Sequence, residues 1–177
     1  QRQMCIRDRV KVNEKWYYMD SNGVMRTNSL IDDTYYVNSS GEMVLNEWRE
    51  LSDNWDHEGG WRYFGANGKA YENGWKQIHD VWYYFNNSVM ATGWQDLDGD
   101  IYYLGSSGAM AAGWKQLPDP NDDWGEYWFY FGTNGKMVRE TEKSISGTAY
   151  IFDHEGRMLT GWVNPSDYTL SLIHISE

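Results

Sequence analysis

The sequence predicts an all-β fold, a solenoid of tandem β-hairpin repeats with about seven units. The first observation behind this prediction is a short aromatic unit that recurs along the 177 residues. The second is composition, because the chain holds 11 Trp and 14 Tyr, 18 Gly and only 3 Pro. The third is that no long stretch repeats its apolar residues at helical spacing. Short strands joined by turns are therefore favoured over helices.

The clearest copy of the unit spans residues 74–94. Aromatic and branched side chains fill residues 75–78 and residues 82–85, which predicts two short strands. His79 and Asp80 supply polar turn residues between them. This copy is therefore a β-hairpin that ends in a short loop before the next Gly-Trp pair.

Both faces of this predicted hairpin are aromatic. Side chains alternate along a strand, so Trp82 and Tyr84 point to one face while Tyr83 and Phe85 point to the other. A lone two-stranded hairpin is marginally stable in water and cannot cover both of its own faces. Neighbouring copies along the chain must cover them, so the hairpins are expected to stack.

Most of the other copies follow the same order of strand, loop glycine, methionine and closing position, which is Gly-Trp in the third, fourth, fifth and seventh copies. The four-residue strand motifs begin, in chain order, at Trp16, Thr34, Trp61, Trp82, Ile101, Trp128 and Ala149. The closing positions are Ser29, Trp48, Trp75, Trp94, Trp114, Thr141 and Trp162, separated by 19, 27, 19, 20, 27 and 21 residues. The fourth copy lacks the loop glycine, and in the fifth Asp98-Gly99 is a strong hairpin turn signal.

Two of the copies are long, and they lie three apart. Each contains an additional acidic segment with one tryptophan, Trp55 in residues 52–60 and Trp124 in residues 118–127. Both segments fall between the two strands of a hairpin, so we expect them to lengthen the hairpin and leave the array intact. The two tryptophans are interpreted as packing within the insertions.

Charge and the chain ends restrict the interpretation further. The formal net charge of −11 argues against nucleic acid as a partner and is compatible with a cationic ligand. No run is apolar enough to predict a membrane span. Residues 1–10 and much of residues 165–177 resemble translated adaptor sequence and are expected to be non-native, which leaves residues 11–164 as the array. The single cysteine, Cys5, lies in the first of these ends.

The ordered set of Gly-Trp, turn, Trp-Tyr-Tyr-Phe, loop glycine and methionine resembles the choline-binding, or cell-wall-binding, repeat of surface proteins from Gram-positive bacteria and their phages. The resemblance covers residues 11–163. Related repeats occur in the glucan-binding ends of streptococcal glucosyltransferases and the receptor-binding ends of clostridial toxins. The resemblance implies a left-handed β-solenoid with ligand cages between consecutive hairpins. No residue pattern in the sequence predicts a catalytic residue, a cofactor or a metal.

A quaternary ammonium group cannot donate a conventional hydrogen bond, so electron-rich ring faces are the efficient way to hold it. In the family a cage combines the Gly-Trp tryptophan and the leading strand tryptophan of one unit with the second tyrosine of the next unit, often beside a methionine. The resemblance thus implies two choline-binding sets, which are Trp48, Trp61 and Tyr84, and Trp75, Trp82 and Tyr103, with Met90 or Met110 as a fourth wall. Weaker candidates are Trp94 with Tyr130 and Trp114 with Trp128.

Other side chains are given structural roles. On strand alternation, the following rings are interpreted as core: Tyr17, Tyr35, Tyr83, Tyr102, Tyr150, Phe64, Phe85 and Phe131. Asp96, Asp98 and Asp100 mimic the start of a calcium loop but lack its glycine, so they are interpreted as a solvated turn. The acidic residues around His57 and His154 are interpreted as solvated loops, because no nucleophile or oxyanion donor accompanies them.

These observations predict a secreted or cell-surface, non-catalytic module that anchors a larger protein to choline-bearing teichoic acid. One alternative is a carbohydrate-binding array for α-glucan or a host glycan, in which the rings stack on sugars. Another is the anchor of a cell-wall hydrolase whose catalytic domain lies outside this sequence. Paired tryptophans favour choline, while the degenerate units and the alternation of long and short copies leave the glycan alternative open.

Overall fold

A computed structural model describes residues 9–53, 58–119 and 122–160. The described residues form fifteen strands in seven antiparallel sheets, and no helix among them is long and apolar enough to cross a membrane. The chain divides into two units, one of residues 1–77 and 83–91 and the other of residues 78–82 and 92–177. The predicted all-β array of hairpins is confirmed.

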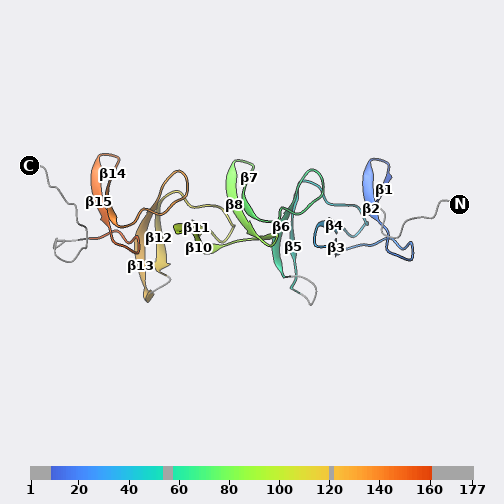
Figure 1. The fold of residues 1–177 in the computed structure, drawn as a ribbon, viewed down its shortest axis with the longest axis horizontal. Coiled ribbons are helices and arrows are strands. Elements are labelled where there is room, and N and C mark those ends of the chain that lie inside the picture. The colour runs from blue at the N-terminus through green and yellow to red at the C-terminus, as the bar shows by residue number, and fades with distance from the viewer. Residues whose placement is uncertain (1–8, 54–57, 120–121, 161–177) are drawn as a thin grey trace, which may run out of the picture. The chain divides into compact units, whose positions relative to one another are not determined.

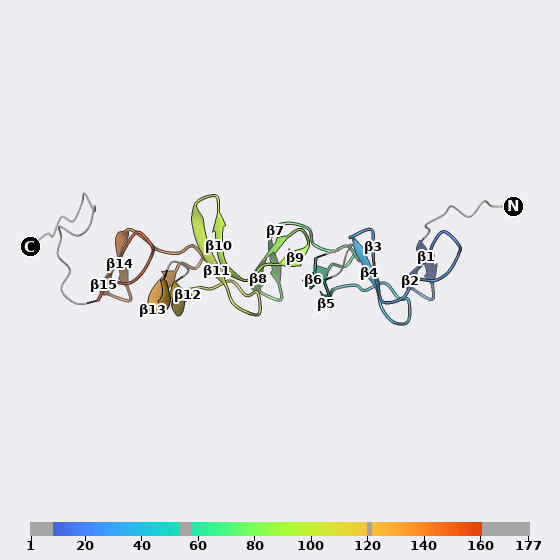
Figure 2. The ribbon, with the colours of Figure 1, turned by 90° about the horizontal axis from the view of Figure 1, so that it is seen from below.

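Each sheet is a hairpin of strands adjacent in sequence, as Figures 1 and 2 show. The first three hairpins are β1 (Arg9–Val12) with β2 (Lys15–Tyr18), β3 (Ser29–Ile31) with β4 (Tyr35–Val37), and β5 (Glu47–Leu51) with β6 (Gly60–Phe64). The fourth sheet is β7 (Gly74–Ile78), β8 (Val81–Asn86) and β9 (Val89–Met90), and the unit boundary falls within it. The last three hairpins are β10 (Gly93–Leu97) with β11 (Asp100–Leu104), β12 (Gly113–Asp119) with β13 (Asp122–Phe131), and β14 (Thr141–Ile145) with β15 (Thr148–Phe152).

Two-residue turns with left-handed backbone join most hairpins. His79 and Asp80 have φ of 48° and 64°, and Asp98 and Gly99 have φ of 57° and 85°, as both turn signals predicted. Two positive φ values define the type I′ turn, whose twist matches that of paired strands. The glycine of a Gly-Trp pair also has left-handed backbone, since Gly93 has φ of 75°. The residues at these turn positions therefore fix the register of the hairpins that they join.

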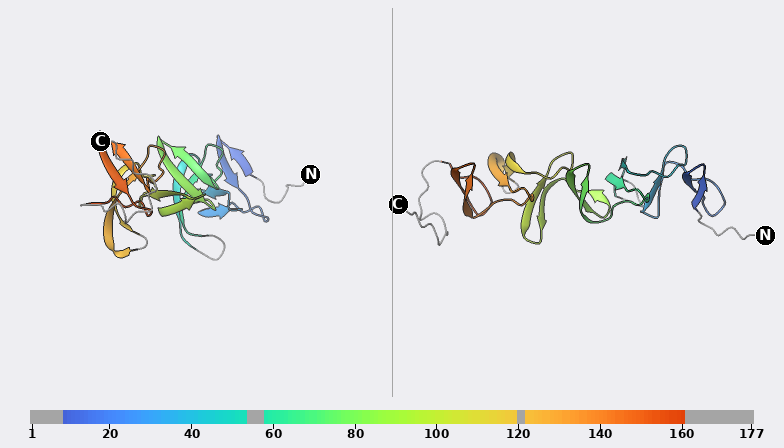
Figure 3. Two further views of the ribbon diagram at one scale, coloured as in Figure 1. Left: turned by 60° about the vertical axis from the view of Figure 1, so that its left-hand side comes forward. Right: turned by 90° about the horizontal axis from the view of Figure 1, so that it is seen from above.

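The loop after each hairpin has one hydrogen-bonding pattern in six of the seven copies that the structure describes. In the second copy, Asn38 N donates to Glu42 O and Gly41 N donates to Asn38 O, both at 2.9 Å. The same two bonds recur in the loops that begin at Asp20, Gly65, Gly105, Gly132 and Asp153. Figure 3 shows these loops between successive hairpins. The fourth copy differs because a two-residue turn of Asn87 and Ser88, with φ of 48° and 66°, replaces the glycine loop and creates β9.

Successive hairpins within a unit are joined through these loops. The amide of Met43 donates to the carbonyl of Trp16 at 2.7 Å, and the amide of Met137 donates to the carbonyl of Ile101 at 2.8 Å. A Cβ added at Gly41 would lie 2.7 Å from Sδ of Met25. The loop glycine thus permits the methionine of the preceding copy to pack on it. This close approach is the physical reason for the paired glycine and methionine of the repeat.

The core is formed by the last residue of each strand motif. These residues are fully buried at 0% exposure in six copies: Val37, Phe64, Phe85, Leu104, Phe131 and Phe152. Tyr102 is also buried, and Tyr17, Tyr35, Tyr83 and Tyr150 are half-buried. The prediction that Phe64, Phe85, Phe131 and Tyr102 belong to the core is confirmed. One long hairpin is extended as expected, since β13 has 10 residues, whereas β5 and β6 have 5 each.

Candidate aromatic binding site

The leading residue of the strand motif faces solvent in four copies. Trp16, Trp61, Trp82 and Trp128 are between 38% and 43% exposed. This position lies three residues before the buried core residue, and an odd spacing along a strand puts the two side chains on opposite faces. The same alternation that builds the core thus leaves a repeated, partly exposed tryptophan ring outside it.

The closing tryptophans pack between hairpins. Trp48 lies opposite Tyr63 in the β5–β6 register, with ring centroids 5.2 Å apart. Its ring also meets two rings of the next copy, Tyr83 at 4.9 Å and Phe85 at 5.7 Å, the latter stacked at 18°. Such ring pairs contribute about 0.5–1.5 kcal/mol beyond their buried area. Trp48 is therefore part of the packing that holds consecutive hairpins together.

The second unit repeats this arrangement. Trp94 contacts Tyr103 across its own hairpin at 5.1 Å and meets Phe129 at 4.9 Å and Phe131 at 6.0 Å in the next. Trp114 likewise contacts Tyr130 at 5.1 Å and Tyr150 at 4.7 Å. A closing tryptophan thus meets its own hairpin's third motif residue and the second and fourth motif residues of the following hairpin.

The first predicted choline set lies entirely within the first unit. The ring of Trp48 meets Tyr83, whereas Tyr84 meets Trp75 at 5.2 Å in an edge-to-face contact. Trp61 is 42% exposed. The strand that carries Met90 lies against the strand that carries Trp61, since a Cβ at Gly60 would be 2.7 Å from Val89 Cγ1. The structure therefore places Met90 and Trp61 on neighbouring strands, and the cage itself stays a prediction.

The other predicted binding residues do not form one group within a single unit. In the second set, Trp75 belongs to the first unit and Trp82 and Tyr103 to the second. Met110 lies against Gly135, a packing position that the sequence did not indicate. Trp114 and Trp128 meet edge to face at 6.3 Å and 83°. Trp55 lies outside the described residues, as does the side chain of Trp124.

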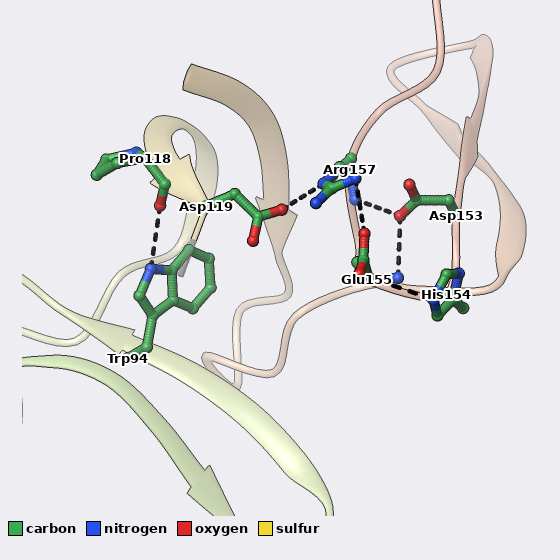
Figure 4. A network of polar contacts seen from close by, with 7 residues as sticks. All are labelled: Trp94, Pro118, Asp119, Asp153, His154, Glu155 and Arg157. Atoms are coloured by element: carbon green, nitrogen blue, oxygen red, sulfur yellow. Dashed lines mark hydrogen bonds and ion pairs between the residues drawn. The ribbon is translucent and has the colours of Figure 1, made fainter. Parts of the chain in front are cut away.

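A polar network fixes the long β12–β13 hairpin, as Figure 4 shows. The indole N–H of Trp94 donates to Pro118 O at 3.2 Å, and the Arg157 guanidinium binds the carboxylate of buried Asp119 and that of Glu155, the latter at 2.7 Å. The hydrogen bond to Asp119 raises the pKa of Arg157. No residue pattern indicates this network, because its members are 24 and 38 residues apart.

Arg62 is a second feature that sequence reasoning missed. It occupies the second position of the third strand motif, where the other copies carry Tyr or Phe. The side chain is 3% exposed, and its Nη2 donates to Glu58 O at 2.8 Å. Burial lowers the pKa of the guanidinium, although the carboxylates of Asp33 and Glu58 oppose this shift. A cation among six aromatic equivalents was the signal in the sequence that could have revealed it.

Comparison with known proteins finds families and proteins that resemble parts of this chain. A family model described as choline-binding repeat matches residues 7–48 and 72–113. Glucosyltransferase-I of Streptococcus downei is 35% identical over 86 residues, which are 47% of this chain and 5% of that protein. Glucosyltransferase-S of the same organism is 29% identical over 85 residues, 46% of this chain and 6% of that protein.

Two solved structures from Streptococcus pneumoniae share the fold. The modular autolysin LytC, solved in complex with a synthetic peptidoglycan ligand, has a TM-score of 0.68 at 27% identity over 86% of this chain and 33% of its own. Choline binding protein F has a TM-score of 0.66 at 30% identity over 85% of this chain and 51% of its own. This chain therefore spans a small part of the curated relatives and a third to a half of the structural ones. The repeated hairpins of this protein are thus similar to choline-binding repeats, in sequence over residues 7–48 and 72–113 and in fold over most of the chain.

Proposed function

We propose that these repeats anchor a larger protein to choline-bearing teichoic acid of a Gram-positive cell wall. The observation that carries the proposal is the recurrence of a leading tryptophan that is about 40% exposed in four copies. A large ring held outside the core at a repeated place is a ready wall for a ligand. The family match and the likeness to choline binding protein F support choline as that ligand.

The site that we propose first uses Trp48, Trp61 and Tyr84, with Met90 beside them. All four residues belong to the first unit. Trp48 is oriented by its contacts with Tyr63 and Phe85, so its position does not depend on ligand. Such preorganisation lowers the entropy cost of binding. The other predicted sets, including Trp75, Trp82 and Tyr103, keep the status of predictions from the sequence.

Affinity at one cage is expected to be weak. Each cation–π wall contributes about 0.5–2 kcal/mol, so three walls give a dissociation constant around the millimolar range for free choline. Several cages that meet one polymer raise the overall affinity by about 10² to 10⁴. Firm attachment therefore requires a ligand with many choline groups, as a wall polymer has. We accordingly place the whole protein outside the cell, on the surface or secreted.

The deciding experiment is elution from a tertiary-amine matrix. A chain of net charge −11 adheres to any cationic resin, and about 1 M sodium chloride screens that attraction. We expect the protein to stay bound in that salt and to leave when millimolar choline is added. Complete elution by salt, with no further effect of choline, would refute the choline anchor.

A carbohydrate-binding array is the second candidate, and the 35% identity to Glucosyltransferase-I favours it. Tryptophan fluorescence separates the two functions, because the exposed rings would report either ligand. A response to choline and none to dextran supports the anchor, whereas a response to dextran alone supports the glycan array. The described hairpins supply a binding module, and an attached catalytic domain, such as a wall hydrolase, is compatible with the likeness to an autolysin.

A further inference from the structure

A cleft of about 670 Å³ opens in the first unit, beside the third hairpin and its loop. The floor of this cleft contains buried Tyr63, buried Ala70 and half-buried Tyr71. Its rim is formed by exposed polar side chains, which are Asn67, Lys69, Glu72, Asn73 and Lys76. The cleft thus combines an aromatic floor with a rim of hydrogen-bonding groups.

The floor is held in place by the packing already described. Tyr63 is fixed by its ring contact with Trp48. Tyr71 donates its hydroxyl to Trp75 O at 3.0 Å and meets Phe85 edge to face at 5.4 Å. The floor therefore adjoins two closing tryptophans yet is built from different rings.

The charge of the rim is opposite to that of the whole chain. Lys69 and Lys76 outnumber the single carboxylate of Glu72, while the chain has a net charge of −11. The ion pairs of the described lysines use Lys11, Lys15 and Lys136. Within the described residues, neither rim ammonium is paired with a carboxylate, and Lys76 Nζ lies 5.4 Å from the Tyr71 ring centroid. Two ammonium groups on one rim, neither paired with a carboxylate in the described part of the chain, favour an anion.

We propose that this cleft binds a sugar residue that carries an anionic group, with the sugar beside the tyrosines of the floor and the anion at the Lys69 and Lys76 rim. Aromatic faces pack against the C–H face of a sugar, and asparagine side chains pair with its hydroxyls. Ammonium groups supply the charge that a phosphate or carboxylate needs. The inference deepens the proposed function, because it adds a contact to the backbone of a polymer whose choline the cage would hold.

The test is a titration followed by the backbone amide resonances of Ala70, Tyr71 and Lys76 in saturating choline, so that cages are already occupied. The probes are glucose 6-phosphate, N-acetylmuramic acid, glucose and inorganic phosphate. We expect at least one anionic sugar to shift these resonances at lower concentration than glucose or phosphate alone. A stronger response to glucose 6-phosphate identifies a phosphosugar source, and a stronger response to N-acetylmuramic acid identifies a carboxylated one.

The double variant Lys69→Gln, Lys76→Gln should weaken this binding by about tenfold, because two exposed charge contacts are removed. The matched control Lys115→Gln, Lys143→Gln makes the same change in net charge on exposed residues of the second unit and should have no effect. Equal binding of glucose and the anionic sugars, equal binding of inorganic phosphate, or no loss in the double variant would each overturn the proposal. Retention of the double variant on the amine matrix tests the choline anchor separately.

Discussion

The third and fifth hairpins differ at one position and agree at another. Their closing tryptophans pack alike, because Trp48 and Trp94 each lie 4.9 Å from the second motif ring of the next copy. Their leading residues differ, since Trp61 is 42% exposed and Ile101 is half-buried. The closing ring therefore packs in the same way with or without a leading tryptophan. Stacking of hairpins and exposure of a leading ring are thus separable within one repeat.

The largest effect should come from removing a closing ring. We expect Trp94→Ala to lower the free energy of unfolding by about 3 kcal/mol, because it leaves a cavity among Tyr103, Phe129 and Phe131 and breaks the bond to Pro118. Urea unfolding of the whole chain measures this loss. Trp128→Ala is the matched control, since that ring is 43% exposed and should cost much less. Similar losses in the two variants would contradict the division between packing and presented rings.

The next largest effect should be a loss of choline affinity with little change in the free energy of unfolding. Trp61→Ala should leave the free energy of unfolding within about 1 kcal/mol of wild type yet weaken choline binding at its cage by about tenfold. Fluorescence titration measures the affinity. Leu45→Ala is the control, because Leu45 is also 42% exposed and belongs to no predicted cage. If both variants bind choline as the wild type does, Trp61 is not a cage wall.

A smaller effect should follow from restoring the missing ring. Ile101→Trp gives the fifth hairpin the pair that the third has, with Tyr130 available in the next copy. The backbone bond from Met137 N to Ile101 O does not depend on the side chain, so the stack should tolerate the change. Equilibrium dialysis should then count one additional choline site. An unchanged count would show that a tryptophan pair alone does not make a cage.

The smallest effect is a pH dependence of one loop. The amides of Val24 and Asn22 donate to the Asp20 carboxylate and lower its pKa below the usual 3.8. A depressed carboxylate pKa stabilises the folded state above the unfolded value, and this contribution is lost as pH falls through the folded value. Thermal unfolding of Asp20→Asn should therefore change less than that of wild type between about pH 5 and pH 2.

In the loop after the second hairpin, the position that corresponds to Asp20 is already an asparagine, Asn38. Asn38 Oδ1 accepts from Ser40 N and Glu42 N at 2.9 and 3.0 Å, so an amide supports the same loop. At neutral pH, Asp20→Asn should accordingly match the wild type. A large loss of stability at neutral pH would mean that the charge of Asp20, and not its geometry, holds the loop.

Local chemistry made much of this structure predictable. Turn residues such as His79 and Asp98, and the alternation that buries Phe85 and exposes Trp82, depend on neighbours in sequence. The fourth copy was recognised as lacking its loop glycine, but the turn of Asn87 and Ser88 that replaces it was not foreseen. That turn has the same left-handed, non-glycine backbone as the turn of His79 and Asp80, but it lies where the other copies have their loop glycine.

Features that join distant parts of the chain could not be predicted. Asp119 and Arg157 are 38 residues apart, and no pattern of residue types pairs them. The same reason applies to Met110, whose partner Gly135 belongs to the next copy. The cage assignment came from a family resemblance, and its geometry depends on side-chain directions that a repeat pattern does not determine.

The backbone bonds from a loop to the preceding hairpin have a consequence for cooperativity. Within the first unit, Met43 N to Trp16 O and Ala70 N to Thr34 O couple a hairpin to its neighbour in sequence. An array coupled mainly between neighbours behaves as a one-dimensional chain, in which an end element is held on one side and an inner element on both. The array should therefore open first at its end, and amide hydrogens of β1 and β2 should exchange with solvent faster than those of β5 and β6.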